Sequence, residues 1–216
     1  MKIVGFPLDV SHLQDRRIVH GLRTRQTLIQ VTLDLIQAGD IEPTSAAIAT
    51  IAGVSGAVLL QHFTGLADLY AAAFDLAVSR ACEHDGPVDP AAPLANRIEL
   101  LVCDRAQLFE EWLPVWHFAE RVGRVAPAIG LGVAQLRRAL RERLAAWFAT
   151  ELGNLAPPSR DLVLDSLDLA FGLDSWMNMR ARQRLSRGHA SRTWRFTAQA
   201  IVLQVLTASD RPVTAP

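Results

Sequence analysis

The sequence of 216 residues has few of the features that mark membrane or secreted proteins. Its longest apolar runs are broken by Arg, Asp or Gln, well short of the ~20 residues that a membrane-spanning helix needs. The N-terminal stretch, residues 1–17, has one Lys and a brief apolar patch interrupted by Asp9. It lacks the longer apolar region and the small-residue cleavage site of a signal peptide. We therefore expect a cytoplasmic protein with no membrane partner.

The sequence also has few cysteines and no net charge. Cys82 and Cys103 are too few for a disulfide framework and have no CxxC spacing, so we expect two free thiols. Lys and Arg number 22, as do Asp and Glu, and residues 1–80 hold six of the former and seven of the latter. Because neither half is broadly basic, any nucleic-acid contact must come from local clusters and its electrostatic part must be modest.

Motifs of enzymes are missing as well. The segment 53–57, Gly-Val-Ser-Gly-Ala, falls short of a nucleophile elbow, because its last residue is Ala and no strand precedes it. There is no P-loop, no GxGxxG after a strand and no HExxH. His117 and Glu120 have the i, i+3 spacing of a metal pair, but no third ligand is visible. We expect neither catalysis nor a cofactor or metal.

What the sequence does contain is helical periodicity, and no segment reads as a strand. The expected helices are 23–38, 46–52, 56–62, 66–82, 94–112, 115–125, 131–153, 159–185 and 191–208. The strongest break is the stretch 84–93, with three Pro and one Gly in ten residues. The sequence therefore predicts an all-α fold in three parts: a basic N-terminal arm (1–22), a helix-turn-helix domain with a connecting helix (23–83) and a helical body (94–208).

The segment 48–55 predicts the helix-turn-helix. Ala49 is small where two helices must cross closely, and Gly53 supplies a turn with positive φ. Val54 fills the space between the helices, and Ser55 caps the second one. The second helix, 56–62, can then enter a major groove. A helical hairpin with no role in DNA binding has the same local pattern and remains an alternative.

The surroundings of this segment carry a family resemblance. An amphipathic helix precedes it, and a new helix begins near Asp68-Leu69. With Ile48-Ala49, Ala52-Gly53-Val54-Ser55, Leu59 and His62-Phe63, this order resembles the TetR family of bacterial one-component regulators over about residues 23–75. The resemblance implies a homodimer in which a three-helix DNA-binding head joins a ligand-binding and dimerisation bundle through a fourth helix. It further implies a repressor that binds double-stranded operator DNA and is released by a small hydrophobic or aromatic effector.

The DNA-contacting residues that we expect on this basis are Arg23, Arg25, Thr44, Ser55, Gly56, Ala57, Val58, Leu60, Gln61 and His62. Three positions depart from the family pattern. Gly56-Ala57 replaces a common Lys-Gly pair, Leu60 replaces a phosphate-binding Tyr, and Gly65-Leu66 stands where a phosphate-facing Lys is usual. Since phosphate contacts supply much of the affinity of a DNA reader, a second hypothesis stays open. It is a TetR-like ligand- or lipid-binding protein with weakened or lost DNA binding.

Some groups can compensate for the missing donors. A basic arm upstream is formed by Arg16, Arg17, His20, Arg23 and Arg25, which can contact phosphates or merely form a solvated leader. Ala57 and Val58 can touch a thymine methyl group, and Gln61 can read an adenine edge.

Aromatic residues concentrate in the body. The expected ligand-binding residues are Phe109, Trp112, Trp116, His117, Trp147, Trp176 and Met177, and ordinary core packing is the alternative for each. The helices at about 159–185 and 191–208 are apolar on more than one face. A helix of that kind must be buried on two sides. We expect a dimer through these helices, an isologous four-helix interface, with central helices of a monomer as the alternative.

Overall fold

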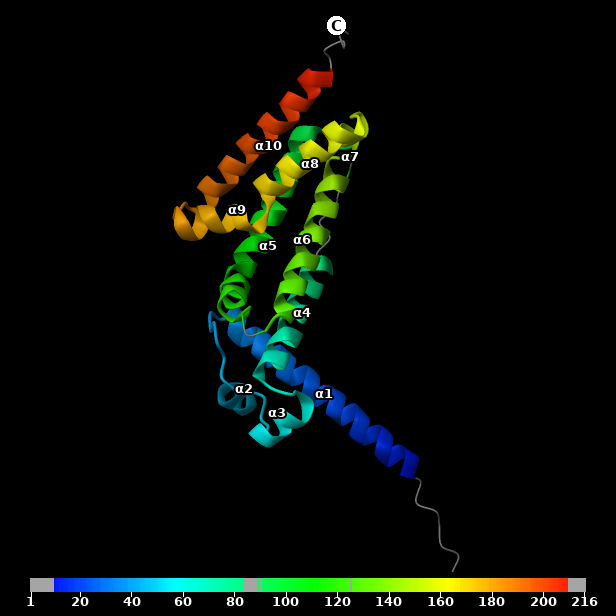
Figure 1. Ribbon diagram of the computed structural model, residues 1–216, viewed down its shortest axis with the longest axis vertical. Coiled ribbons are helices and arrows are strands. Elements are labelled where there is room, and N and C mark those ends of the chain that lie inside the picture. The colour runs from blue at the N-terminus through cyan, green and yellow to red at the C-terminus, as the bar shows by residue number, and fades with distance from the viewer. Residues whose placement is uncertain (1–9, 84–88, 90, 125, 210–216) are drawn as a thin grey trace, which may run out of the picture.

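The computed structural model describes residues 10–83, 89, 91–124 and 126–209, with side chains placed between residues 18 and 204. Over this part of the chain the protein is helical, without strands, so the predicted all-α fold is confirmed (Figure 1). The helices are α1 (Val10–Gln37), α2 (Ser45–Ile51), α3 (Gly56–His62), α4 (Leu66–Glu83), α5 (Leu94–Val122), α6 (Ala128–Trp147), α7 (Ala149–Gly153), α8 (Pro157–Phe171), α9 (Leu173–Met177) and α10 (Arg187–Ser209). A π-helical turn, η1 (Asn178–Arg182), follows α9.

The head consists of α1, α2 and α3, and its local geometry follows the sequence closely. Gly53 has φ +69°, which is the left-handed turn predicted between α2 and α3. The Ser55 hydroxyl accepts a hydrogen bond from the Val58 amide, and Thr44 caps α2 by accepting from the Ala47 amide. Ile48 and Leu59 are buried against α1, so the two short helices are held on one apolar core.

The first helix is longer than predicted. It begins at Val10, thirteen residues before the expected start, and runs on past α2 and α3 (Figure 1). No Pro interrupts residues 10–22, and Gly21 is the one residue in this stretch with a markedly low helix propensity. The second half of the predicted N-terminal arm is therefore helical, while residues 1–9 lie outside the described residues.

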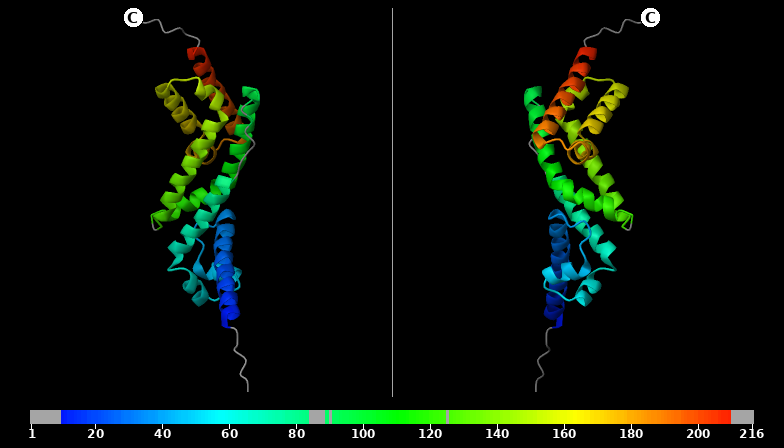
Figure 2. Two further views of the ribbon diagram at one scale, coloured as in Figure 1. Left: turned by 90° about the vertical axis from the view of Figure 1, so that its right-hand side faces the viewer. Right: turned by 90° about the vertical axis from the view of Figure 1, so that its left-hand side faces the viewer.

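The body is built around α5, with α4 connecting it to the head. Helix α4 packs against α1 on one side and against α6 on the other, and α10 packs on α5 and α8 (Figure 2). Phe74 of α4 meets Trp112 of α5 edge-to-face, with ring centroids 5.9 Å apart. Deeper in the body, Trp194 lies 4.5 Å from Trp176 and 5.3 Å from Phe171, again between ring centroids. Head and body therefore share continuous packing through α4.

Three predicted helix boundaries in the body are wrong. Helix α5 continues through Pro114, which we expected to separate two helices. Pro114 cannot donate to the Glu110 carbonyl, but Trp112 before it and Phe118 after it are buried in the same core, so packing keeps the helix intact. The segment expected as one helix from 131 to 153 divides at Phe148, whose φ and ψ are −112° and 24°.

The third difference is a break at Gly172, where the predicted helix 159–185 divides into α8, α9 and η1. Gly172 has an extended backbone, with ψ 160°, and a Cβ there would lie 2.9 Å from the Asp168 carbonyl oxygen. The break leaves carbonyls of α8 without helical partners, and the Arg105 guanidinium of α5 donates to one of them, the Phe171 oxygen, at 2.7 Å. The same guanidinium donates to the Leu140 oxygen of α6, so it ties three helices together.

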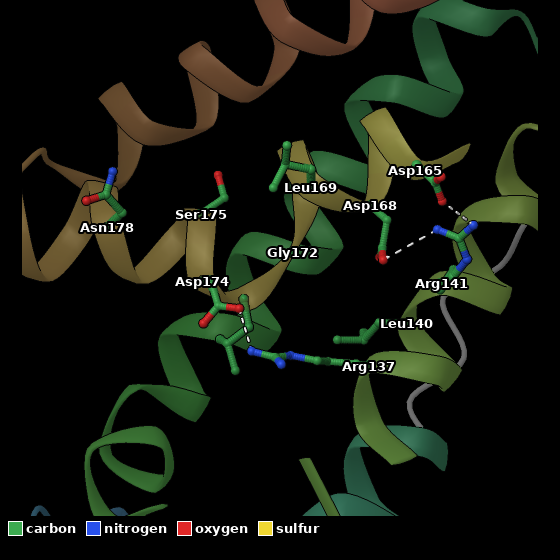
Figure 3. Close-up of a pocket in the computed structure, with 11 residues that line it drawn as sticks. Arg137, Leu140, Arg141, Asp165, Asp168, Leu169, Gly172, Asp174, Ser175 and Asn178 are labelled. Carbon is green, nitrogen blue, oxygen red and sulfur yellow. Dashed lines mark hydrogen bonds and ion pairs between the residues drawn. The ribbon is translucent and has the colours of Figure 1, made fainter. Parts of the chain in front are cut away.

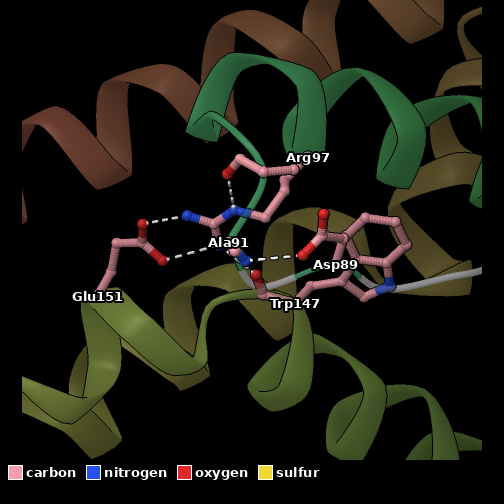
Figure 4. Close-up of polar contacts among 6 residues, drawn as sticks. Asp89, Ala91, Arg97, Trp147 and Glu151 are labelled. Carbon is pink, nitrogen blue, oxygen red and sulfur yellow. Dashed lines mark hydrogen bonds and ion pairs between the residues drawn. The ribbon is translucent and has the colours of Figure 1, made fainter.

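A second buried arginine joins the start of α5 to α6 and α7. Arg97 at the start of α5 forms a two-bond ion pair with Glu151 of α7, at 2.5 and 3.0 Å (Figure 4). It also donates to the backbone oxygens of Trp147 and Ala92. Both side chains are at most 9% exposed, so each charge depends on the other for compensation.

Candidate functional site

The outer face of the head presents most of the predicted DNA-contacting residues. Those exposed to solvent are Arg23, Thr44, Ser55, Gly56, Ala57, Leu60 and Gln61, whereas Arg25, Val58 and His62 are half-buried. Leu60 is 66% exposed, so α3 presents an apolar side chain at the position of the missing Tyr. The Arg25 guanidinium lies over the Phe63 ring, 4.7 Å from its centroid, and is held within the head by a cation–π contact. The face is therefore shaped by small and apolar groups, with Gln61 as its exposed amide.

The segment that contains α2 and α3 is unusually poor in positive charge for a surface that would meet phosphate. Residues 26–79 contain no Lys or Arg and five acidic residues: Asp34, Asp40, Glu42, Asp68 and Asp75. The cations nearest to α3 along the chain are those of α1, which include Arg23 and Arg25, and Arg80 at the end of α4. Electrostatic attraction to a polyanion must therefore act mainly through α1.

Tyr70 of α4 joins the head to the body. Its hydroxyl donates to the Pro43 carbonyl at 2.8 Å, and its ring stands edge-on to Phe118 of α5, with centroids 5.1 Å apart. Burial, assisted by the negative charges of Glu42 and Asp40, raises the pKa of Tyr70 to about 12. The loop that carries Glu42 is also tied to α5 by an exposed ion pair with Arg121, at 3.1 Å.

The aromatic residues expected to bind a ligand do not line one common cavity. Phe109, Trp147 and Trp176 are buried in the core. Trp112 borders a small cavity of about 130 Å³ between α1, α4 and α5. Trp116, His117 and Met177 border another, of about 170 Å³, beside α9. The structure thus brings three of the seven together.

A cleft of about 560 Å³ lies between α6 and the bend from α8 to α9 (Figure 3). Ion pairs cross it. Arg137 is 2.6 Å from Asp174, and Arg141 is 2.6 Å from Asp165 and 3.6 Å from Asp168. Its apolar lining is formed by Leu140, Leu169 and Leu173. The cleft is therefore both charged and apolar, unlike the aromatic cavity that the sequence suggested.

The two cavities beside α9 share a wall. Asp174 and Asn178 line both the 560 Å³ cleft and the 170 Å³ cavity. The Arg137 guanidinium also lies 5.9 Å from the centroid of the Trp116 ring. Arg137, Asp174 and Trp116 therefore meet at the boundary between them.

Comparison with solved structures identifies this arrangement. A TetR-family transcriptional regulator from Streptomyces coelicolor matches with a TM-score of 0.66 and 22% identity, over 90% of this chain and 92% of that chain. A proposed TetR-family transcriptional regulator from Rhodococcus sp. matches with a TM-score of 0.50 and 15% identity, over 83% of this chain and 99% of that chain. This chain has the fold of the TetR-family regulators. No family model and no curated protein matches the sequence.

Within the TetR-type fold, sequence reasoning missed the residues that hold the body together. Complete burial lowers the pKa of the Arg105 guanidinium to about 10, although Asp168 and Asp104 oppose this effect. Burial acts to raise the pKa of Glu110, but hydrogen bonds from Arg180 and Trp176 lower it overall. These side chains are far apart in sequence, and nothing in the helical pattern distinguishes them from exposed charges. The single Tyr of the sequence was the one signal that could have drawn attention to Tyr70.

Two further features of the TetR-type fold concern metals and membranes. Among the described residues, no three or more His, Cys, Asp or Glu side chains gather as a metal site would require. Cys82 and Cys103 are free thiols, as predicted. In the described part of the chain, no single helix is long and apolar enough to cross a membrane. Helices α2 and α3 pass that test only when combined, and they meet at 100°.

Proposed function

We propose that this protein is a homodimeric one-component transcriptional regulator of the TetR type. It acts as a repressor, binding operator DNA through α3 and α1 and leaving it when a small effector binds to the body. The observation that carries the proposal is the capped helix-turn-helix, with its left-handed Gly53 and with α3 exposed at the end of the molecule. A fold shared with TetR-family regulators over most of the chain supports it.

The DNA contacts of this proposal divide into two kinds. Ala57, Leu60 and Gln61 of α3 face solvent and would meet base edges, where apolar groups favour thymine methyls and an amide favours adenine. Arg23 of α1 and its neighbours upstream would meet phosphates. Specificity would thus rest on α3, and most of the electrostatic affinity would rest on α1.

Dimerisation would use α8 and α10. Both present large apolar side chains on the outside: Leu162 on α8 is 68% exposed, and Phe196 and Leu203 on α10 are 74% and 59% exposed. The opposite faces, which include Leu167 and Trp194, are buried in the core. Helices with two apolar faces in one chain favour a second copy as the partner of the outer faces.

A second candidate is a TetR-like ligand- or lipid-binding protein with weakened or lost DNA binding. The absence of Lys and Arg from residues 26–79 favours it, because a reader without nearby cations gains little from counterion release.

A titration of the purified protein with its own promoter DNA separates the two candidates. Fluorescence anisotropy at low and moderate salt, with a scrambled duplex of equal length as competitor, measures specific binding. The regulator binds the promoter more tightly than the scrambled duplex, and Gln61→Ala reduces that preference by about 1–3 kcal/mol. Leu131→Ala on α6, a residue 76% exposed, serves as the control that leaves it unchanged. Absence of specific binding at low salt, with circular dichroism showing an intact helical fold, favours the second candidate.

A further inference from the structure

We propose that the cleft between α6 and the bend from α8 to α9 binds an organic cation with an apolar body. The charged end of this ligand takes the place that the Arg137 guanidinium now occupies. The inference names the effector class and its site, and it rests on the proposed function only where occupancy is said to alter DNA binding.

The Arg137 guanidinium lies beside both an aromatic ring and a carboxylate. It lies 5.9 Å from the centroid of the Trp116 ring. It also lies 2.6 Å from a carboxylate oxygen of Asp174 (Figure 3). An aromatic face beside a carboxylate is an arrangement that attracts cations. The protein thus holds one of its own cations at this place.

The Arg137 side chain is easily displaced from Asp174 and Trp116. The side chains of Arg137 and Asp174 are 56% and 64% exposed, and an ion pair at that exposure adds little to stability. Arg137 can therefore turn into solvent and leave Trp116 and Asp174 to another cation. Such an exchange keeps one positive charge at the site.

The charged residues that line the cleft and the adjoining cavity also favour a positive ligand. The acidic residues that line the two adjoining cavities are Asp165, Asp168, Asp174 and Glu120. Without Arg137, they face the guanidiniums of Arg141 and Arg182, and Asp168 also faces the buried charge of Arg105. Four carboxylates then stand against three cations, so a positive ligand restores the balance and a negative one worsens it.

The size and apolar lining of the cleft favour a ligand with an apolar body. Leu140, Leu169 and Leu173 give an apolar ligand body a surface to contact. A volume of about 560 Å³ falls in the range of ordinary small-molecule sites. Inorganic cations and short amines would leave this lining unused, so the ligand class is an organic cation that carries rings or alkyl groups.

Helix α6 connects the cleft to the head. Its Arg143 donates to the backbone oxygens of Ala81 and Cys82 at the end of α4, at 3.1 and 2.5 Å. At Gly132 its backbone approaches Phe74 of α4 so closely that a Cβ would lie 2.9 Å from the ring. Displacing Arg137 removes the ion pair that joins α6 to Asp174 of α9, while α6 stays attached to α4. Occupancy of the cleft therefore biases the position of α4, the helix that directly follows α3 in the chain.

Isothermal titration of the full chain with two ions of matched shape tests the site without DNA. Tetraphenylphosphonium binds to the wild-type protein, and tetraphenylborate binds at least tenfold more weakly. Asp174→Asn weakens phosphonium binding at least tenfold, whereas Arg137→Ala strengthens it severalfold because the place is vacated. Arg121→Ala, which breaks the comparably exposed pair with Glu42, leaves the affinity unchanged. Thermal melts establish that each variant folds.

Several results overturn the proposal. They are preference for the borate, loss of phosphonium binding in Arg137→Ala, unchanged binding in folded Asp174→Asn, and no binding of either ion to the wild type. None of these depends on DNA, so they leave the regulator proposal standing, and failure to bind promoter DNA leaves the cation site standing. Addition of the phosphonium to the protein–promoter complex then tests the link. A decrease in affinity for the promoter supports coupling through α6, and an unchanged affinity contradicts it.

Discussion

At the scale of single residues, Tyr70 shows how one side chain can join the parts of the molecule. It is 3% exposed, and its hydroxyl, ring and backbone belong to three different contacts: the Pro43 carbonyl before α2, Phe118 of α5, and α4 itself. Burial, and after it the negative charges of Glu42 and Asp40, disfavours the phenolate and raises the pKa of this hydroxyl. The residue therefore reports on the junction between head and body.

Because Tyr70 is the only tyrosine, its ionisation can be followed directly by absorbance at 295 nm. We expect a midpoint at about pH 12 in the folded protein and near 10 in urea. Since the folded pKa lies above the unfolded one, the stabilisation is complete below about pH 10 and is lost as the pH rises from 10 through 12. Tyr70→Phe shows no ionisation signal at 295 nm, and its stability does not fall between pH 10 and 12 for this reason. At neutral pH it is about 1 kcal/mol less stable than the wild type, because the hydrogen bond to Pro43 is lost. A native midpoint near 10 would contradict the burial of the Tyr70 hydroxyl.

At the scale of helices, the approach of α6 to α4 depends on one glycine. A Cβ at Gly132 would lie 2.9 and 3.0 Å from two ring atoms of Phe74, which is itself packed against Trp112. Gly132→Ala must displace the packed Phe74 ring or push the two helices apart, and we expect a loss of about 1–3 kcal/mol in the free energy of unfolding by urea. Gly130→Ala, two residues earlier with no atom within 4 Å of the new Cβ, gains about 0.5–1 kcal/mol instead. Equal effects of the two substitutions would show that the close approach is unimportant.

The helices also show why some of the fold was predictable and some was not. Gly53 and Ser55 act through their own backbone and the next turn, so the helix-turn-helix could be read from adjacent residues. The continuity of α5 through Pro114 depends on packing partners far away in sequence, as does the break at Gly172. Local signals cannot supply such information.

The same distinction applies to the candidate site. Trp116, His117 and Met177 were predicted because aromatic and sulfur-containing side chains stand out in a helical pattern. Arg137 and Asp174 were not, since they lie 37 positions apart and each alone resembles a solvated surface charge. A site made of exposed charges from different helices becomes visible only when the fold brings them together.

At the scale of the whole molecule, the outer faces of α8 and α10 predict a dimer. The double variant Leu162→Glu/Phe196→Glu places carboxylates in the centre of the expected four-helix interface, where they would be desolvated without partners. Sedimentation equilibrium should give twice the chain mass for the wild type and the chain mass for this variant. Leu131→Glu on α6, at a comparably exposed position, should remain dimeric. A double variant that stays dimeric would require another interface.

The distribution of charge over the whole molecule leads to a prediction about DNA affinity and salt. Since residues 26–79 lack Lys and Arg, the slope of log Kobs against log salt must come mainly from α1. Each lost phosphate contact reduces the slope by about 0.9, so Arg23→Ala in a dimer should reduce it by about 1.8. Arg138→Ala, an exposed arginine of α6, should leave it unchanged, because α6 belongs to the body. Anisotropy titrations across a salt series measure both slopes. Were Arg23→Ala to keep the wild-type slope while binding promoter DNA, the phosphate contacts would have to be made by groups other than this arginine of α1.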